Sequence, residues 1–276
     1  MIVIRNCEGF DELEACVQLQ VETWGLDDLE TTPRKTFLLA QKIGGQVMGA
    51  FDTEMAGTGE RGGPESLVGF AMALPGMKTM DSAPRPYLHS HMLAVRKHYR
   101  NRGLGAKLKW EQRLEALGRG IRLMEWTFDP LEIKNAYLNI HKLGAVVRGY
   151  LVDFYGVSSS QLQGGLPTDR LVAEWWLDSP RVQAVLEGHP AVARSVKEKI
   201  EERISVPASI YEWKASEAGR ERAQTVQLEN RIKFQRAFSQ GLAIVGFSLD
   251  AEGNGIFELG LPNPSELAAT SEGIKK

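Results

Sequence analysis

Apolar and polar positions follow one another along the chain with the spacing of successive strands and helices. Short apolar runs predict strands, and they cover residues 2–4, 47–51, 67–74, 87–95, 121–128, 146–155 and 171–177. Apolar residues at helical spacing predict helices, and they cover residues 10–24, 33–42, 104–117 and 131–143. The resulting order, β-α-α-β-β-β-α-β-α-β-β, predicts an α/β (α+β) fold.

The remainder of the chain carries a further pattern. We predict helices over residues 181–187, 191–203 and 217–238, a strand over 207–213, and a hairpin of 242–249 and 255–261. This part is α+β and too short to hold a large independent core. We therefore expect a first domain at 1–178 and an extension at 179–276 that packs on it. The extension would cover a substrate site or form a dimer interface, and the pattern does not choose. The tail after Leu261 is expected to be loosely ordered.

Composition limits the functions that are open to the chain. Of 276 residues, 43% are hydrophobic, which supports a real core, and the formal net charge of −2 argues against nucleic acid as the main partner. The two cysteines, Cys7 and Cys16, cannot staple a domain of this size, so we expect reduced, partly buried thiols in a cytosolic protein. We find no signal-peptide pattern and no apolar run of membrane-spanning length, so we expect a cytoplasmic protein without a membrane partner.

The stretch from Leu93 to Ala106 is the most informative part of the sequence. A strand-like run leads into a basic turn with Gly103 and Gly105, and a helical pattern follows at once. The first N–H groups of a helix have no internal partner, and the helix dipole places positive charge there. Glycines let a phosphate approach the backbone, and Arg100 and Arg102 add charge. The stretch predicts a phosphate site, most naturally for a pyrophosphate.

The turn has neither a P-loop nor the three-glycine dinucleotide fingerprint. Instead, Arg100-x-x-Gly103-x-Gly105, preceded by Leu93-x-Val95, resembles the acetyl-CoA pyrophosphate loop of the GNAT superfamily of N-acyltransferases. The alternative is an ordinary strand-to-helix connection with solvated basic residues. The resemblance implies a GNAT fold, a central mixed sheet flanked by helices, with acetyl-CoA or another acyl-CoA as co-substrate and no metal. It implies cofactor contacts from Leu93, Val95, Arg100, Asn101, Arg102, Gly103, Leu104, Gly105 and Ala106. The local basic cluster, from Arg96 to Lys109, suits one phosphorylated cofactor.

The resemblance is looser in the helix over 131–143. Asn135 resembles the asparagine that contacts the pantetheine arm in many GNAT proteins, although it lies two residues closer to Gly144 than usual. Ile140 stands where the family usually has a tyrosine that protonates the departing CoA thiolate. We take Tyr137 as the candidate for this general acid. The alternative is an aromatic core residue on an amphipathic helix.

Acyl transfer to an amine also needs a base, because only the unprotonated amine is nucleophilic. The resemblance places the oxyanion contact on a main-chain N–H near Met92 and Leu93. His91 and His89 alternate with Ser90 and should share one side of the strand. Glu125, in the next strand, would be costly to bury unless it is paired or functional. We take His91 and Glu125 as candidate bases, and we expect His91 to titrate in its ordinary range. Hydrogen-bonded core histidines are the alternative; Asp129 and Glu22 are weaker candidates for the base.

Asp169 and Arg170 form a polar pair after a proline turn, beside a strand with two tryptophans. Arg170 suits a carboxylate on the acceptor or on the acyl group, because its planar fork donates two parallel hydrogen bonds. We therefore predict both residues as substrate-binding, with a turn in which Arg170 pairs with Asp169 as the alternative.

Together these observations predict an acyl-CoA-dependent N-acyltransferase of the GNAT type, with acetyl-CoA as the default donor. The expected partners are an acyl-CoA and an amine of a small molecule or amino acid, and a homodimer is possible. Two alternatives stay open. One is a non-catalytic, CoA-binding regulatory module, suggested by Ile140. The other is an N-succinyltransferase that uses succinyl-CoA, in which Arg170 or the histidine pair meets the distal carboxylate.

Overall fold

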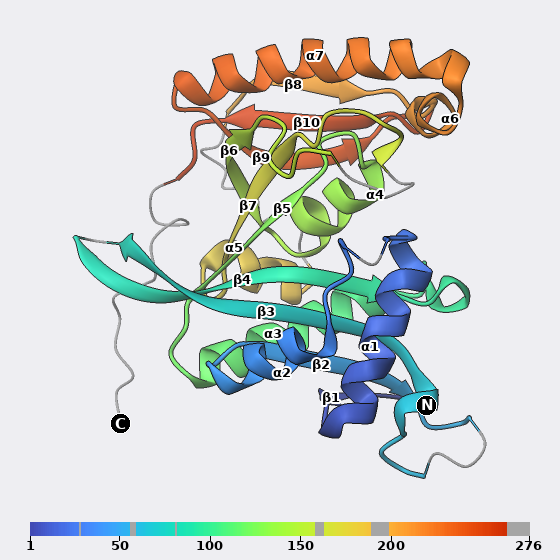
Figure 1. Cartoon of the computed structure of the whole chain (residues 1–276). Helices are drawn as coiled ribbons and strands as arrows, with labels where there is room; N and C mark the ends of the chain where they lie inside the picture. Colours follow the sequence, from blue (N-terminus) through green and yellow to red (C-terminus); the bar gives the residue numbers. More distant parts are fainter. Residues whose placement is uncertain (28, 56–58, 81, 158–162, 189–198, 264–276) are drawn as a thin grey trace. The chain divides into compact units, whose positions relative to one another are not determined.

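The computed structural model describes residues 1–27, 29–55, 59–80, 82–157, 163–188 and 199–263 (Figure 1). These residues form two compact units. The first unit runs from Met1 to Ile121, and the second contains the described residues from Arg122 onward. Among the described residues, no helix combines the length and the apolar character that crossing a bilayer requires.

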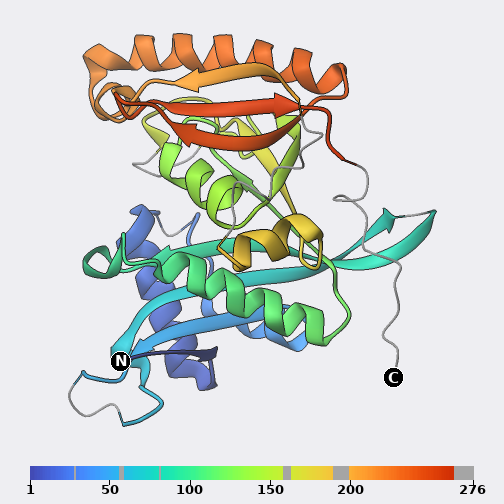
Figure 2. The same cartoon turned by 180° about the vertical axis from the view of Figure 1, so that it is seen from behind.

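The first unit pairs four antiparallel strands in the order β1-β2-β3-β4. They are β1 (Ile2–Asn6), β2 (Gln46–Asp52), β3 (Leu67–Met80) and β4 (Ala83–Val95), with helices α1 (Gly9–Trp24), α2 (Arg34–Lys42) and α3 (Leu104–Gly118). Alternate residues of β2 pack in two different cores. Val47 and Phe51 join a cluster with α1 and α2, whereas Met48 and Ala50 join a cluster with α3. The sheet therefore has helices on both faces, and Figure 2 shows α3 from the side opposite to α1.

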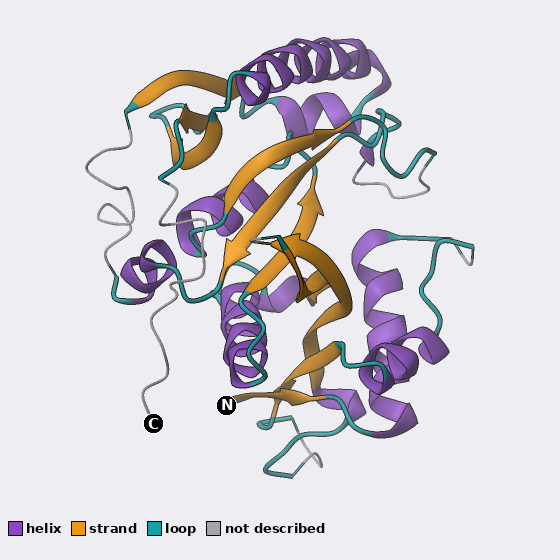
Figure 3. Ribbon diagram, turned by 90° about the vertical axis from the view of Figure 1, so that its left-hand side faces the viewer, coloured by secondary structure: helices purple, strands orange, loops and turns teal. Residues whose placement is uncertain are grey.

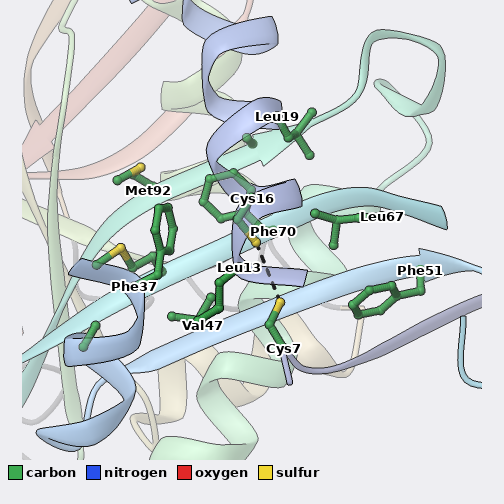
Figure 4. Close-up of a cluster of buried hydrophobic side chains, with 13 residues drawn as sticks. Cys7, Leu13, Cys16, Leu19, Phe37, Val47, Phe51, Leu67, Phe70 and Met92 are labelled. Atoms are coloured by element: carbon green, nitrogen blue, oxygen red, sulfur yellow. Dashed lines mark hydrogen bonds between the residues drawn. The ribbon is translucent and has the colours of Figure 1, made fainter. Parts of the chain in front are cut away.

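The core between α1, α2 and the sheet contains both cysteines (Figure 4). Cys7 follows β1, and Cys16 lies on the inner side of α1, with 3.8 Å between their sulfur atoms. Both thiols are free and buried. Burial and the contact with Cys7 hold the pKa of Cys16 well above its usual range. The cysteines are more deeply buried than expected, and they act as small apolar core residues.

The second unit pairs six strands in the order β5-β7-β6-β9-β10-β8. They are β5 (Leu123–Phe128), β6 (Val146–Leu151), β7 (Arg170–Trp176), β8 (Ile200–Val206), β9 (Ala243–Leu249) and β10 (Gly255–Gly260). The helices are α4 (Ile133–Ala136), the π-helix η3 (Tyr137–Lys142), α5 (Pro180–Leu186), α6 (Ile210–Ala215) and α7 (Glu217–Ser239). The long helix α7 packs on β6 and β8 (Figure 3). Phe234 of α7 contacts the rings of Tyr150, Phe238 and Phe257.

The predicted element order and the α/β fold class are confirmed, and several boundaries or assignments differ. β3 and β4 are longer than predicted, since β3 continues to Met80 and β4 begins at Ala83. Residues 207–213 form a turn and the start of α6 rather than a strand, because Ile210 and Lys214, four residues apart, bury one helix face. Of the helix predicted over 191–203, residues 191–198 lie outside the described part, and residues 200–203 belong to β8. That strand alternates between exposed and buried residues, and its charges suit an edge strand. β6 ends at Leu151, before Asp153 adopts a φ of 45°.

The C-terminal strands pair directly with strands of the predicted first domain. β9 contacts β6 through the pair Val147 and Ile244. The division into residues 1–178 and 179–276 stays a prediction. The predicted loosely ordered tail lies largely outside the described residues.

Candidate functional site

The chain between β4 and α3 turns sharply through two residues with left-handed backbone geometry. β4 ends at Val95, the short helix η2 (Lys97–Tyr99) follows, and Asn101 and Gly103 have φ values of 61° and 76°. Glycine adopts this geometry without a steric penalty, which explains Gly103 at the last position before α3. No side chain of the described residues caps this helix, and its first turn contains no acidic residue. The turn therefore presents backbone N–H groups at the positive end of α3.

The basic side chains near this turn differ in orientation. Arg100 folds back onto the strand, where its Nε donates a hydrogen bond of 2.8 Å to the carbonyl oxygen of Val95. Arg102 and Lys107 line a pocket of about 270 Å³ beside the first turn of α3. A wall of the same pocket is formed by Tyr99 and Asp52, whose hydroxyl and carboxylate lie 2.7 Å apart. This hydrogen bond lowers the pKa of Asp52 and raises that of Tyr99. The lining of the pocket thus includes the cationic side chains of Arg102 and Lys107 and the carboxylates of Asp52 and Glu54.

β4 carries a β-bulge just before the loop. The strand pairing passes from Ser90 opposite Ala73 directly to Met92 opposite Met72, so that His91 is the extra residue. Bulges bend a strand and re-aim its groups, and they are frequent beside active sites. The bulge directly precedes Met92 and Leu93, the region for which the family resemblance predicts the oxyanion contact.

The two histidines are neighbours, as their alternation predicts. The ring centroids of His89 and His91 lie 6.5 Å apart. Burial lowers the pKa of His89, and the positive charges of His91 and Lys109 lower it further. Desolvation also lowers the pKa of His91, although this residue is exposed at the surface. The expectation that His91 titrates in its ordinary range is therefore wrong. A lowered pKa keeps both rings neutral at pH 7, so each can accept a proton.

Lys109 faces the interior of the first unit, and the sequence analysis missed it by assigning it to the basic cluster. Only 2% of Lys109 is exposed, and its Nζ donates a hydrogen bond of 2.6 Å to the buried hydroxyl of Ser90. Burial lowers the pKa of Lys109 to about 7. The signal was present in the sequence, because Lys109 shares a helical face with the buried residues Gln112 and Ala116.

Glu125 lies in the second unit, directly across from Glu174 of β7. Both side chains are buried, and Arg148 binds Glu174 through two hydrogen bonds. Like charges at opposite positions of a sheet repel each other, and Arg148 offsets this repulsion. The spacing in the sequence could not reveal Glu174, because the register between β5 and β7 decides which residues face each other.

The candidate acid, Tyr137, begins the π-helix η3. Its ring stacks on His141 with 4.6 Å between centroids, while Ile140 is buried and Asn135 is exposed. The sequence predicted one continuous α-helix here. The structure instead has the wider π-helical turn, in which the N–H of Leu143 donates a hydrogen bond of 3.0 Å to the carbonyl oxygen of Leu138, five residues earlier. Such π-turns are frequent at functional sites.

Asp129, at the end of β5, binds a lysine from the C-terminal region. The Nζ of Lys214 lies 2.8 Å from Asp129 Oδ2 and 3.0 Å from Glu132 Oε1. Burial would lower the pKa of Lys214, but the two carboxylates outweigh it and raise this pKa. The triad ties α6 to the turn that leads into α4.

Asp169 and Arg170 do not form an ion pair with each other. Asp169 is fully buried and receives two hydrogen bonds from Arg231 of α7, of 2.8 and 2.9 Å, and one of 2.6 Å from Tyr150. Arg170 donates instead to the backbone oxygen of Asp169 and to Gln163, and its guanidinium lies 5.2 Å from the centre of the Tyr155 ring. The alternative in which Arg170 pairs with the carboxylate of Asp169 is therefore wrong. Their roles in substrate binding stay predictions.

The predicted site residues fall into two groups. The loop predicted to bind the cofactor, residues 100–106, lies in the first unit together with Leu93, Val95 and His91. The second unit contains the other candidates, Glu125, Tyr137, Asn135, Asp169 and Arg170.

Comparisons with known proteins identify the fold through structure alone. No protein-family model matches the sequence, and no curated protein matches it. Arabidopsis thaliana NAA60 in complex with acetyl-CoA matches with a TM-score of 0.52 and 17% identity, over 64% of this chain and 98% of that one. The same protein in complex with a bisubstrate analogue matches with a TM-score of 0.50 and 15% identity, over 64% and 99%. The ribosomal-protein-S18-alanine N-acetyltransferase from Escherichia coli matches with a TM-score of 0.46 and 16% identity, over 63% and 92%. The chain therefore has the fold of the GNAT acetyltransferases, with a further region beyond that fold.

Proposed function

We propose that this protein is an acyl-CoA-dependent N-acyltransferase, with acetyl-CoA as the default donor and an amine of a small molecule or amino acid as the acceptor. The observation that carries the proposal is the turn from Val95 to Leu104, where left-handed backbone geometry exposes the first N–H groups of α3. The GNAT fold supports it, and a structural neighbour was solved with acetyl-CoA bound.

In this proposal the donor is held by its phosphates. The N–H groups of residues 101–106 bind the pyrophosphate, and Arg102 and Lys107 add positive charge from the neighbouring pocket. Leu93 and Val95 run beside the pantetheine arm, and Asn135 contacts it. The pocket accommodates the nucleotide end of the molecule.

Acyl transfer then needs three groups around the thioester. A main-chain N–H just after the β4 bulge, near Met92 and Leu93, stabilises the oxyanion. His91 or Glu125 accepts the proton of the attacking amine, directly or through water. His91 suits this role because its lowered pKa keeps the imidazole neutral at pH 7. Tyr137 protonates the CoA thiolate as it leaves.

Isothermal titration with acetyl-CoA and with CoA tests the donor site, and two glycines allow a matched comparison. Gly103 and Gly120 lie at the two ends of α3, have φ values of 76° and 75°, and have open space where a Cβ would stand. Gly103→Val and Gly120→Val should therefore lose similar amounts of stability. We expect only Gly103→Val to lose binding, because its side chain meets the phosphates. Absence of binding of either ligand to the folded wild-type protein at high micromolar concentration contradicts the proposal.

A non-catalytic CoA-binding module is the second candidate, and Ile140 favours it, because this buried residue replaces the usual tyrosine. Thiol release measured with a thiol-trapping dye separates the two across a panel of amines, amino acids and peptides. Binding of CoA without turnover on any acceptor supports the module. Faster thiol release with succinyl-CoA than with acetyl-CoA, abolished in Arg170→Met, supports the succinyltransferase.

A further inference from the structure

The residue before the β4 bulge is held from the side by α3. Ser90 is buried, and its hydroxyl receives the hydrogen bond of 2.6 Å from the Nζ of Lys109. The same hydroxyl lies 3.5 Å from Oε1 of Gln112, one turn further along α3. Two side chains of one helix thus converge on the strand residue that directly precedes the extra residue His91.

A lysine is a costly choice for this position. Its buried neighbours on the inner face of α3 are both apolar, such as Leu108, and polar, namely Gln112 and Arg113. A leucine or methionine at this position would fill the space without removing an ammonium group from water. The cost is visible in the pKa of Lys109, which burial lowers to about 7. What lysine adds over an apolar side chain is a strong donor for the Ser90 hydroxyl.

Helix α3 connects this contact to the phosphate loop. The helix begins at Leu104, directly after the loop, and Lys109 follows five residues later, roughly 7.5 Å along the axis. A rigid helix therefore holds two points in register, the loop where phosphates would bind and the strand residue beside the bulge.

We propose that Lys109 is a positioning residue that acts through the Ser90 hydroxyl. It holds the main chain of the β4 bulge so that the N–H groups after the bulge meet the thioester carbonyl of a bound acyl-CoA. Lys109 itself touches neither substrate nor cofactor. The inference rests on the proposed function, since it assigns the β4 bulge to the thioester carbonyl.

The ratio of two affinities tests this role without knowledge of the acceptor. CoA contains every group of acetyl-CoA except the acyl carbonyl and its methyl, so loss of the carbonyl contact weakens acetyl-CoA alone. We expect Ser90→Ala and Lys109→Met each to lower the affinity for acetyl-CoA about two- to tenfold relative to CoA, the effect of one hydrogen bond. Ser90→Thr keeps the hydroxyl and should retain the wild-type ratio. Ser66→Ala is the matched control, since Ser66 is also buried but its hydroxyl bonds, among the described residues, only to Gly63.

A spectroscopic measurement distinguishes the proposed positioning role from a purely structural role of Lys109 and Ser90. With acetyl-CoA labelled with ¹³C at the carbonyl, we expect the bound resonance to move downfield in the wild type. In both variants it should return toward the free position. The double variant should show no more loss of the preference for acetyl-CoA than either single variant, because both changes break the same hydrogen bond between Lys109 and Ser90.

The outcomes separate the inference from the proposed function. If the wild type binds neither CoA nor acetyl-CoA, the proposed function fails and the inference with it. If both ligands bind but the affinity ratio and the carbonyl resonance are unchanged in Ser90→Ala and Lys109→Met, the positioning role is overturned while the proposed function stands. An equal loss in Ser66→Ala likewise overturns it, because the effect would then follow from any buried serine.

Discussion

Lys109 in the first unit and Lys214 in the second are both buried, with 2% and 8% of each residue exposed, yet their pKa values move in opposite directions. Burial lowers that of Lys109 to about 7, and its hydrogen bond goes to the neutral hydroxyl of Ser90. The pKa of Lys214 is raised, because the attraction of Asp129 and Glu132 outweighs its burial. Burial alone therefore does not decide what a lysine does; the charge of its surroundings does.

The comparison also separates two kinds of contribution to the molecule. Lys214 neutralises two carboxylates at the end of β5 and so stabilises the second unit. We expect Lys109 to cost stability in the first unit, because burial lowers its pKa, and such a cost is typical of groups retained for function. The predictions below test this contrast, in order of decreasing expected effect on stability.

Lys214→Met should give the largest loss. The variant leaves Asp129 and Glu132 as two like charges in a buried site, and we expect a loss of about 3–5 kcal/mol in the free energy of unfolding at pH 7. Chemical denaturation of the protein, followed by tryptophan fluorescence, measures this loss in the free energy of unfolding.

The pH dependence of the stability of Lys214→Met tests the direction in which the pKa of Lys214 is shifted. The raised pKa of Lys214 means that its stabilisation is complete below its unfolded value of 10.5 and is lost only as pH rises above it. The variant should therefore be weakest relative to wild type at neutral pH. It should recover in part at pH 4, because burial raises the pKa of Glu132 and this carboxylate takes up a proton there. An equal loss at both pH values contradicts the ion-pair explanation.

Lys109→Met should instead stabilise the first unit. Each pKa unit by which folding depresses an amine is worth about 1.4 kcal/mol, and we expect a gain of about 2 kcal/mol or more at pH 7. Between pH 7 and 10.5 the unfolded chain binds more protons at Lys109 than the folded chain does, so wild-type stability rises with pH in this window. The difference between variant and wild type should therefore narrow from pH 7 to pH 9. A variant that is less stable than wild type at pH 7 would contradict the contrast with Lys214.

Direct titration sharpens the comparison without a change in stability. With ¹⁵N-labelled lysine, the Nζ resonance of Lys109 should titrate near pH 7 and that of Lys214 above 10.5. The variants Lys109→Met and Lys214→Met assign the two signals. If both titrate together near the ordinary value, the opposition between them is wrong.

Lys199→Met is the control with the smallest effect. Lys199 is 82% exposed in its side chain and lies 3.3 Å from Glu201. Exposed ion pairs contribute about 0–1 kcal/mol, so we expect a change near zero at every pH. A loss comparable to that of Lys214→Met would mean that the denaturation experiment does not distinguish a buried lysine from an exposed one.

The sequence predicted local features well and long-range pairs poorly, for a physical reason. The turn at Gly103 and the start of α3 depend on residues within a few positions of one another, so their pattern is legible in the chain. The bond of Lys109 to Ser90 spans 19 residues and that of Lys214 to Asp129 spans 85. Such partners depend on sheet register and helix packing. The same limit explains α6, whose Ile210, Tyr211 and Trp213 have strand-like side chains but belong to a helix that buries Lys214.

The two thiols of the first unit are also natural probes of its unfolding. Cys7 and Cys16 are the only cysteines of the chain, and both lie in the core under α1. A thiol reagent reaches them only when that core opens, so their labelling rate reports the opening of the first unit and is silent about the second. Four of the six tryptophans, Trp126, Trp175, Trp176 and Trp213, lie in the second unit. Labelling and fluorescence on one unmodified protein can therefore show whether the two units open together or one after the other.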